Sequence, residues 1–111
     1  MVMASSKSNG SKSLKIPHKG DILSTNAEES VEAISRALTD NPEATDIQVD
    51  LRTARMIDSV GLNVLIGLIK QTRDRPATVT LRISSPSIKR LFDVSHIHEL
   101  AEVDYSPRRQ R

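Results

Sequence analysis

The sequence is poor in two kinds of residue that support many protein functions: it has no cysteine, and Phe92 and Tyr105 are its only large aromatic residues. Without cysteine the chain has no disulfide, no thiol nucleophile and no cysteine-ligated metal, which is typical of proteins in a reducing cytoplasm. With so few aromatic residues, the hydrophobic core must consist almost entirely of aliphatic side chains. Stacking of bases on aromatic side chains, which single-strand nucleic-acid binders use, is excluded as well.

Long hydrophobic runs are also lacking. The most apolar stretch, residues 60–69, contains Gly61, Asn63 and Gly67, and it is about half as long as the ~20 residues of a membrane-spanning helix. We therefore expect no direct membrane insertion. The serine-rich N-terminus has no apolar segment of the kind found in secretory signals, so we expect a cytoplasmic protein.

Neither sign of charge dominates the chain. The net charge is +2, and the excess basic residues lie mainly at 7–19 and 108–111, so we find no basic groove and expect no nucleic-acid partner. The composition, with 37% hydrophobic and 27% charged residues, is that of one globular domain. Because the two ends have too few apolar residues to be ordered by burial, we expect a disordered leader at 1–13, one domain at 14–105 and a flexible basic tail at 106–111.

Hydrophobic periodicity predicts alternating strands and helices. The expected elements are an extended stretch at 14–22, a helix at 25–41, a strand at 46–51, a helix at 59–73, a strand at 78–83, a helix starting at 85 and a short edge strand at 100–103. The helix at 59–73 is apolar nearly all round and should be largely buried. Strand, helix and strand in succession over 46–83 predict a right-handed βαβ unit with parallel strands, and hence an α/β fold.

Local signals predict where two of these helices begin. Thr25 and Glu28 have the spacing of a capping box, in which each side chain bonds a free backbone N–H at the start of a helix. Ser85 followed by Pro86 has the pattern of an N-cap and a first helical residue. The first helix should end near Asn41, because the following proline disfavours a helical conformation there.

Asp58 and Ser59 stand at the predicted start of the apolar helix. Aspartate is a favoured N-cap and serine is tolerated in the first turn, so capping alone accounts for both residues. The four glycines form no phosphate-binding loop, and the three histidines do not have the spacing of a metal site. The residues by themselves therefore leave open whether this position is structural or functional.

Three segments of the chain resemble the STAS domain of bacterial anti-sigma factor antagonists. They are GDILSTNAEE at 20–29, MIDSVGLNVLIGLIK at 56–70 and SPSIKRLFDVS at 85–95. Their order and spacing fit across the predicted βαβ unit, and the resemblance extends over about residues 20–103. It implies a small STAS-like α/β domain with a mixed β-sheet, a parallel βαβ core and helices packed mainly on one face.

The resemblance also implies a binding switch rather than an enzyme, with no cofactor. In that family the serine after the aspartate is phosphorylated by an anti-sigma factor kinase, which here makes Ser59 the phosphorylation site. The implied partners are an anti-sigma factor or GHKL-type serine kinase, bound when Ser59 is unphosphorylated, and a PP2C-type phosphatase that reverses the modification. The residues expected at the partner interface are Asp21, Ser24, Thr25, Asp58, Val60, Gly61 and Leu62.

A second interpretation is a STAS regulatory or structural subunit of a larger assembly, such as a transporter or a stress-signalling complex.

Three departures from the family pattern bear on the choice of partner. Leu23 stands where many relatives have an aspartate, although Asp21 is close enough to substitute for it. His96 stands where a glycine is common, so we expect the turn there to be reshaped. The chain also offers one strand, rather than two, before its first helix.

Overall fold

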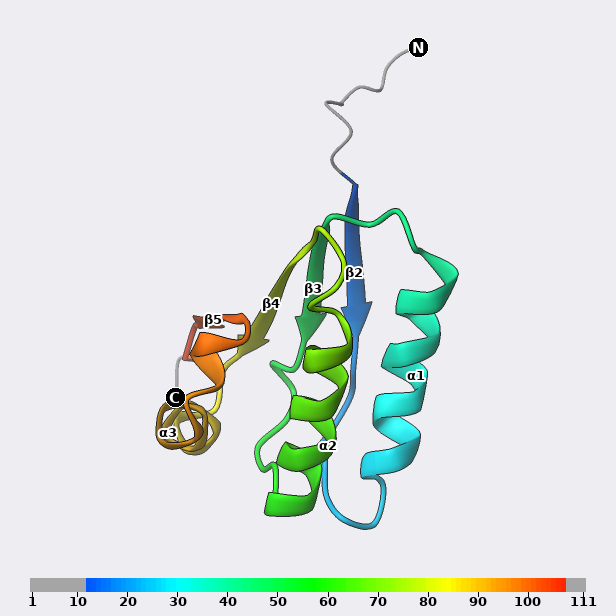
Figure 1. Cartoon of the computed structure of the whole chain (residues 1–111). Coiled ribbons are helices and arrows are strands. Elements are labelled where there is room, and N and C mark those ends of the chain that lie inside the picture. Colours follow the sequence, from blue (N-terminus) through cyan, green and yellow to red (C-terminus); the bar gives the residue numbers. More distant parts are fainter. Residues whose placement is uncertain (1–11, 108–111) are drawn as a thin grey trace.

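The computed structural model describes residues 12–107, in which strands and helices alternate along the chain (Figure 1). The elements are β2 (Ser13–Pro17), α1 (Ala27–Asp40), β3 (Asp46–Asp50), α2 (Ser59–Gln71), β4 (Thr78–Ile83), α3 (Pro86–Ser95), the 3-10 helix η1 (Ile97–Glu99) and β5 (Glu102–Tyr105). The expected leader at 1–13 lies outside the described residues except for its last two, and Ser13 already belongs to β2. The expected tail lies outside them except for Ser106 and Pro107.

The four strands form one sheet in the order β2-β3-β4-β5, and each neighbouring pair is parallel. The predicted α/β class and parallel βαβ core are therefore confirmed. The expectation of a mixed sheet is not met in residues 12–107, because a helical segment between each pair of successive strands returns the chain to the end of the sheet where the strands begin. The carboxyl ends of the strands consequently lie at the same end of the sheet, and α1 and α2 begin at that end of the molecule (Figure 1).

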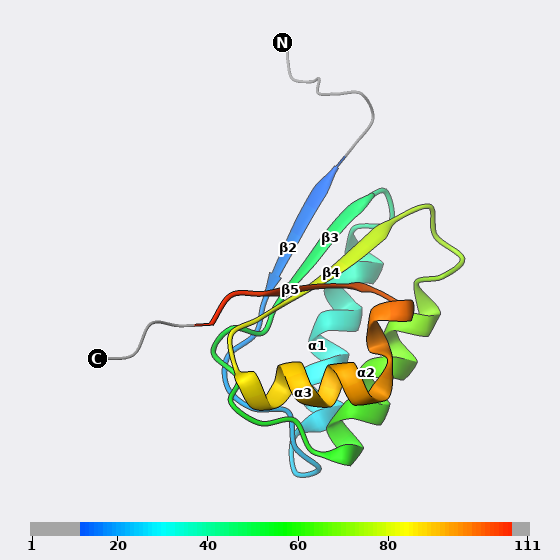
Figure 2. The same ribbon diagram turned by 90° about the vertical axis from the view of Figure 1, so that its left-hand side faces the viewer.

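The sheet is covered by helices on one side, as the sequence predicted (Figure 2). Along β3, Ile47 and Val49 are buried in the core, while Asp46, Gln48 and Asp50 between them are only half-buried. Alternate residues of a strand point to opposite faces, so the apolar residues face the helices and the polar residues form the opposite face. The same alternation in β4 buries its three apolar side chains.

The core is aliphatic around a single aromatic ring. The largest fully buried side chains are Phe92, Ile22, Ile34, Ile47, Leu51, Leu65, Leu81, Ile83, Ile88 and Ile97. Fully burying a side chain of this size stabilises the folded state by about 1.5–3 kcal/mol relative to leaving it exposed. Ile22 belongs to the core although it lies outside the strands, which fixes the connection between β2 and α1 against the rest of the molecule.

Helix α2 is less buried than its sequence predicted. Leu65, Leu68 and Ile69 are buried, whereas Val64 and Ile66 are only half-buried. One face of the helix packs on the sheet and α1, and the half-buried residues flank that face.

The two predicted helix starts had different outcomes. Ser85 caps α3, because its Oγ accepts a hydrogen bond of 3.3 Å from the Ile88 N–H, and this confirms the prediction. The capping box at Thr25 does not form: α1 begins at Ala27, with Asn26 in the N-cap position. The Asn26 side chain makes its hydrogen bonds backwards to the preceding loop, so the chain is still in a turn at Thr25. The end of α1 at Asp40 agrees with the prediction.

The end of the chain differs from the prediction in two details. Strand β5 begins at Glu102, two residues later than expected, because the chain first forms η1. His96 ends α3 with φ 60° and ψ 30°, the left-handed conformation that glycine usually supplies at this position. A histidine thus occupies a backbone conformation that is unfavourable for it.

Candidate functional site

Two loops meet beyond the ends of β2 and β3. Gly20 has φ +83°, which lets the chain turn after β2, and its N–H donates to Thr53 Oγ1 at 3.0 Å. Ile22 then pairs in parallel with Ile57: its N–H donates to the Met56 carbonyl, and its carbonyl accepts from the Asp58 N–H, each at 3.2 Å. The first loop, residues 20–26, is thus joined to the second loop, residues 52–58, as a short continuation of the sheet.

Asp21 holds the second loop from the first. Its Oδ1 accepts hydrogen bonds from the backbone N–H groups of Arg55 at 2.7 Å and Met56 at 3.2 Å. The side chain is half-buried between the loops. Asp21 was expected to contact a partner, and the structure gives it this internal bonding role.

Asp58 holds the first loop from the second. Its Oδ1 accepts from the Gly61 N–H at 2.8 Å, which caps α2, and its Oδ2 accepts from the Ser24 N–H at 2.7 Å. The predicted N-cap is confirmed, whereas the bond to Ser24 was not foreseen. The N–H groups of Gly61 and Ser24 stabilise the ionised carboxylate, so the pKa of Asp58 lies below its usual value. Asp21 and Asp58 thus form a reciprocal clamp, in which each carboxylate binds the backbone of the other loop.

Gly61 lies where α2 crosses the first loop. A Cβ atom at this position would overlap the Ile22 carbonyl oxygen and lie 2.9 Å from the carbonyl carbon, so no larger side chain fits without displacing the loop. Gly61 is buried. The resemblance implies a partner contact at Gly61, and within this chain Gly61 packs against Ile22.

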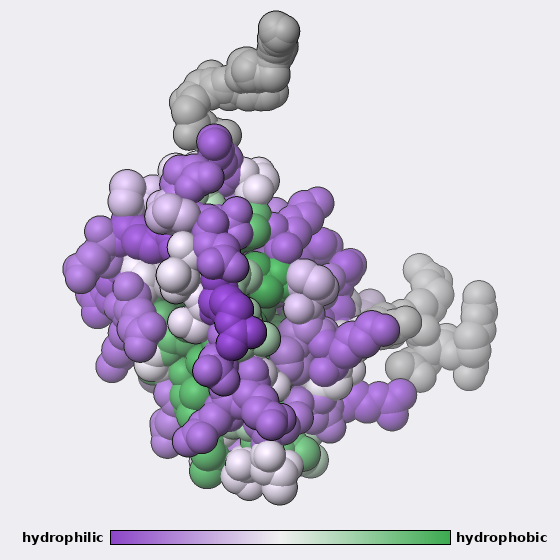
Figure 3. Space-filling view, turned by 90° about the vertical axis from the view of Figure 1, so that its right-hand side faces the viewer, coloured by the Kyte–Doolittle hydropathy of each residue, from purple (hydrophilic) through white to green (hydrophobic). Residues whose placement is uncertain are grey.

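Ser59, the first residue of α2, is exposed at the outer surface of this loop pair. Two large apolar side chains near it in the sequence are exposed: Val60, the next residue, is 46% exposed, and Met56, three residues earlier, is 56% exposed. Figure 3, which looks onto the side of α1, shows a mostly hydrophilic face on which hydrophobic side chains are visible in several separate places, including the lower end of the molecule, where α1 and α2 begin. We call Ser24, Thr25, Met56, Ser59 and Val60, which are all exposed, the Ser59 surface.

The exposure of Met56 was missed by the sequence analysis. Apolar residues are normally assigned to the core. Met56 and Ile57 are adjacent apolar residues, and the sequence does not indicate that only Ile57 is buried. Among the other expected interface residues, Ser24, Thr25 and Val60 are exposed, and Leu62 is half-buried on α2.

The Ser59 hydroxyl makes no hydrogen bond with any group in residues 12–107. The adjacent carboxylate, Asp58, uses both oxygens for backbone N–H groups.

Elsewhere in the described residues, His96, His98 and Glu99 could hold a metal ion, since their ligand atoms lie within 4.8 Å of one another. All three are exposed and lie just after α3 and in η1. Among the described helices, none is both long enough and apolar enough to cross a membrane.

A comparison with known protein families identifies the family of this chain. The profile of the STAS domain matches residues 7–108, nearly the whole chain. The protein belongs to the STAS domain family. The resemblance inferred from the three sequence segments is thereby confirmed.

Two solved structures are similar to this STAS domain. An anti-sigma factor antagonist from Mycobacterium paratuberculosis superposes with a TM-score of 0.71 over 87% of this chain and 79% of that one. The anti-sigma factor antagonist SpoIIAA in its unphosphorylated form superposes with a TM-score of 0.59 over 88% of this chain and 82% of that one. Both share 16% sequence identity with this chain, a level at which the likeness shows a common fold.

Proposed function

We propose that this STAS domain is a phosphorylation-controlled anti-sigma factor antagonist. In its unphosphorylated state it binds an anti-sigma factor or a GHKL-type serine kinase through the Ser59 surface, and phosphorylation of Ser59 ends the complex. The observation that carries the proposal is the exposed Ser59 hydroxyl at the first position of α2, with the exposed apolar residues Met56 and Val60 close to it in the sequence. The antagonists of similar fold support it.

The residues of the site divide into two roles under this proposal. The exposed side chains of Ser24, Thr25 and Val60, with half-buried Leu62, contact the partner. Asp21, Asp58 and Gly61 contribute indirectly, because they fix the two loops that present the contacting residues. A surface that is already ordered binds with a smaller entropic cost than a flexible one.

Phosphorylation acts on this surface through charge and size. The kinase transfers the γ-phosphoryl group of ATP to Ser59 Oγ, ADP leaves, and the hydroxyl proton passes to a base of the kinase. The phosphate adds about −1.5 to −2 charges at pH 7. A partner that packs against Met56 and Val60 must then desolvate this charge, and each 1.4 kcal/mol of cost weakens binding about tenfold. A PP2C-type phosphatase restores the hydroxyl by hydrolysis.

The same geometry supports a non-catalytic role. Asp58 uses its oxygens to cap α2 and to hold Ser24, and it makes no hydrogen bond with the Ser59 hydroxyl, so we assign the serine as the substrate of another enzyme. ATP and its magnesium ion come with the kinase, and the switch operates in the cytoplasm.

One observation favours the alternative function, a STAS subunit of a larger assembly such as a transporter or a stress-signalling complex. The face of the sheet that carries Asp46, Gln48 and Asp50 is not covered by any helix of residues 12–107. All-parallel sheets are normally covered on both faces. A stable complex that covers this face irrespective of Ser59 phosphorylation would identify the alternative.

The test is mass spectrometry of the protein after incubation with ATP and the candidate kinase. Wild type is compared with Ser59→Ala and with Ser87→Ala, which removes an exposed serine from the equivalent first turn of α3. We expect one added phosphate in wild type and Ser87→Ala and none in Ser59→Ala. An unchanged phosphate gain in Ser59→Ala, or no gain from a kinase that is active on another substrate, would contradict the proposal.

A further inference from the structure

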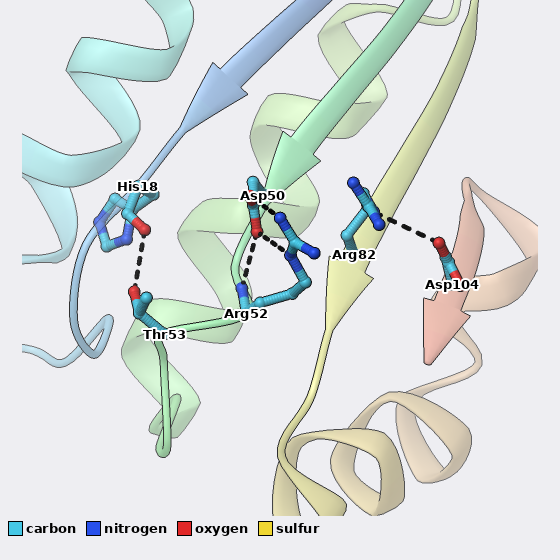
Figure 4. Close-up of polar contacts among 6 residues, drawn as sticks. All are labelled: His18, Asp50, Arg52, Thr53, Arg82 and Asp104. Atoms are coloured by element: carbon cyan, nitrogen blue, oxygen red, sulfur yellow. Dashed lines mark hydrogen bonds and ion pairs between the residues drawn. The ribbon is translucent and has the colours of Figure 1, made fainter. Parts of the chain in front are cut away.

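A second site lies where the four strands end. A surface pocket of about 500 Å³ is lined by residues that follow β2, β3, β4 and β5. His18 and Lys19 follow β2, Arg52 and Thr53 follow Asp50 at the end of β3, and Ser84 follows β4. Figure 4 shows His18, Asp50, Arg52 and Thr53 at the ends of β2 and β3. None of the residues of the Ser59 surface lines this pocket.

The walls of the pocket are held in place by backbone hydrogen bonds. The His18 N–H donates to the Asp50 carbonyl at 3.1 Å, and the Ser106 N–H donates to the Ile83 carbonyl at 2.9 Å, so pairing extends beyond the strands themselves. Thr53 joins the two loops, because its Oγ1 donates to the His18 carbonyl at 3.1 Å and accepts from the Gly20 N–H. A pocket fixed in this way is already formed before a ligand arrives.

Two residues that line the pocket each have a side-chain polar atom without a hydrogen bond in residues 12–107. His18 Nδ1 is completely buried and makes no hydrogen bond. Ser84 is 6% exposed, and its hydroxyl has no hydrogen-bond partner within residues 12–107. His18 Nδ1 is closed off from the pocket surface, whereas the Ser84 hydroxyl is not fully buried and is therefore accessible to a ligand in the pocket.

The charged groups around the pocket have a positive balance. Arg52 binds Asp50 through Nε and Nη2 at 2.9 and 2.8 Å, which neutralises the one carboxylate of the lining. A guanidinium has five N–H donors, so three remain available to another acceptor. Lys19 is exposed at the same pocket and adds a positive charge.

We propose that this pocket binds a small molecule that carries a phosphate or carboxylate group. Lys19 and the remaining guanidinium N–H groups of Arg52 bind the anionic group, while Ser84 Oγ binds a neutral polar atom of the same molecule. The volume lies in the range of about 300–1,000 Å³ that is usual for small-molecule sites. The carboxyl ends of parallel strands are also where open α/β sheets commonly bind ligands. This site is independent of the function proposed for Ser59.

The test is a titration followed by two-dimensional ¹H–¹⁵N NMR, with inorganic phosphate, glycerol 3-phosphate and succinate as separate probes at constant ionic strength. We expect saturable shifts of the backbone amides of His18, Lys19, Thr53 and Ser84. A stronger response to the two phosphates identifies phosphate as the anionic group, and a stronger response to succinate identifies carboxylate.

Matched variants separate specific binding from general attraction to basic residues. Lys19→Gln changes an exposed side chain, so the fold is retained, and it should weaken binding about tenfold, as should Arg52→Gln. Arg36→Gln, on the exposed face of α1, should leave binding unchanged. The proposal is overturned if none of the three probes shifts the pocket amides, if the shifts do not saturate, or if Lys19→Gln and Arg36→Gln bind as wild type does.

Discussion

The Ser24 N–H donates a 2.7 Å hydrogen bond to Asp58 Oδ2, and this bond joins two residues that are 34 positions apart in the chain. The other oxygen of the same carboxylate caps α2. One side chain therefore fixes both the start of the helix that carries Ser59 and the neighbouring loop of the Ser59 surface. The strength of this link can be tested without any knowledge of the partner.

Replacement of Asp58 should lower stability in a graded way. The variant Asp58→Asn keeps one side-chain carbonyl oxygen and can accept only one of the two loop-fixing bonds, whereas Asp58→Ala loses both. We expect the midpoint of urea denaturation to fall in the order wild type, Asp58→Asn, Asp58→Ala. Asp74→Asn, which alters an exposed aspartate in the turn after α2, should leave the midpoint unchanged. Equal midpoints for wild type and Asp58→Ala would show that the clamp does not stabilise the fold.

The same carboxylate should make stability depend on pH. The pKa of Asp58 in the folded protein lies below its usual value of 3.8, because the N–H groups of Gly61 and Ser24 favour the ionised form. The folded state therefore gains stability that is complete above the unfolded-state pKa and is lost as pH falls through the folded-state pKa. We expect the melting-temperature difference between wild type and Asp58→Asn to be largest near pH 7 and to shrink below about pH 4. A constant difference from pH 7 to pH 3 would contradict this.

Two glycines of α2 should respond in opposite ways to the same substitution. Gly61→Ala places a methyl group against the Ile22 carbonyl and should destabilise the protein by about 1–3 kcal/mol, or more if the loop cannot move. Gly67→Ala meets no atom within 4 Å, and alanine should stabilise the helix by up to about 1 kcal/mol. Urea denaturation of both variants measures the two effects. A neutral Gly61→Ala variant would mean that the loop does not contact α2 so closely.

The left-handed conformation of His96 predicts a stabilising substitution. His96→Gly removes an unfavourable backbone conformation and should stabilise the protein by about 1 kcal/mol. The side chain lost with it makes an exposed contact of 3.6 Å with Glu99 and a tilted ring contact with exposed His98, with the ring centroids 5.7 Å apart, and we expect both to contribute little. His98→Gly, at a residue of η1 without a positive φ, should instead be destabilising. Thermal denaturation distinguishes the pair, and destabilisation by both would refute the left-handed assignment.

The exposed apolar side chains beside Ser59 should matter for binding but not for folding. Met56→Ser and Val60→Ser should each weaken binding to the unphosphorylated-state partner about tenfold, because they remove apolar contact area at the proposed interface. Both positions are exposed, so the melting temperature should change little. Val94→Ser, at a valine that is 73% exposed on α3, is the matched control and should bind normally. Normal binding by Met56→Ser and Val60→Ser would place the interface elsewhere.

Much of the fold was predictable because its signals are local. The alternation of Ile47 and Val49 with polar residues identifies β3, and the Asp58-Ser59 pair identifies the start of α2. A capping preference acts over three or four residues and can be recognised without knowing the rest of the structure. Thr25 shows the limit of such signals. The side chain of Asn26 forms hydrogen bonds with the backbone of Asp21 and Leu23 in the preceding loop, and the helix begins two residues later than predicted.

The clamp and the pocket were not predictable, because each depends on chain segments that meet only after folding. Asp21 was expected at the partner interface. Its bonds to the backbone N–H groups of Arg55 and Met56 require the parallel pairing of Ile22 with Ile57. His18 and Ser84 are far apart in the sequence and share a pocket only through the order of the strands. Composition and periodicity carry no information about such distant contacts.

The all-parallel sheet also constrains how the chain can reach its folded state. Asp46 pairs with Ser13 on one side and with Thr78 on the other, so no strand can find its neighbour until the whole intervening helical segment has been made. Sheets closed by such distant contacts form slowly compared with hairpins. During synthesis, one side of β4 stays unpaired until Glu102 to Tyr105 have left the ribosome, so until then this six-residue strand is available for pairing with other chains.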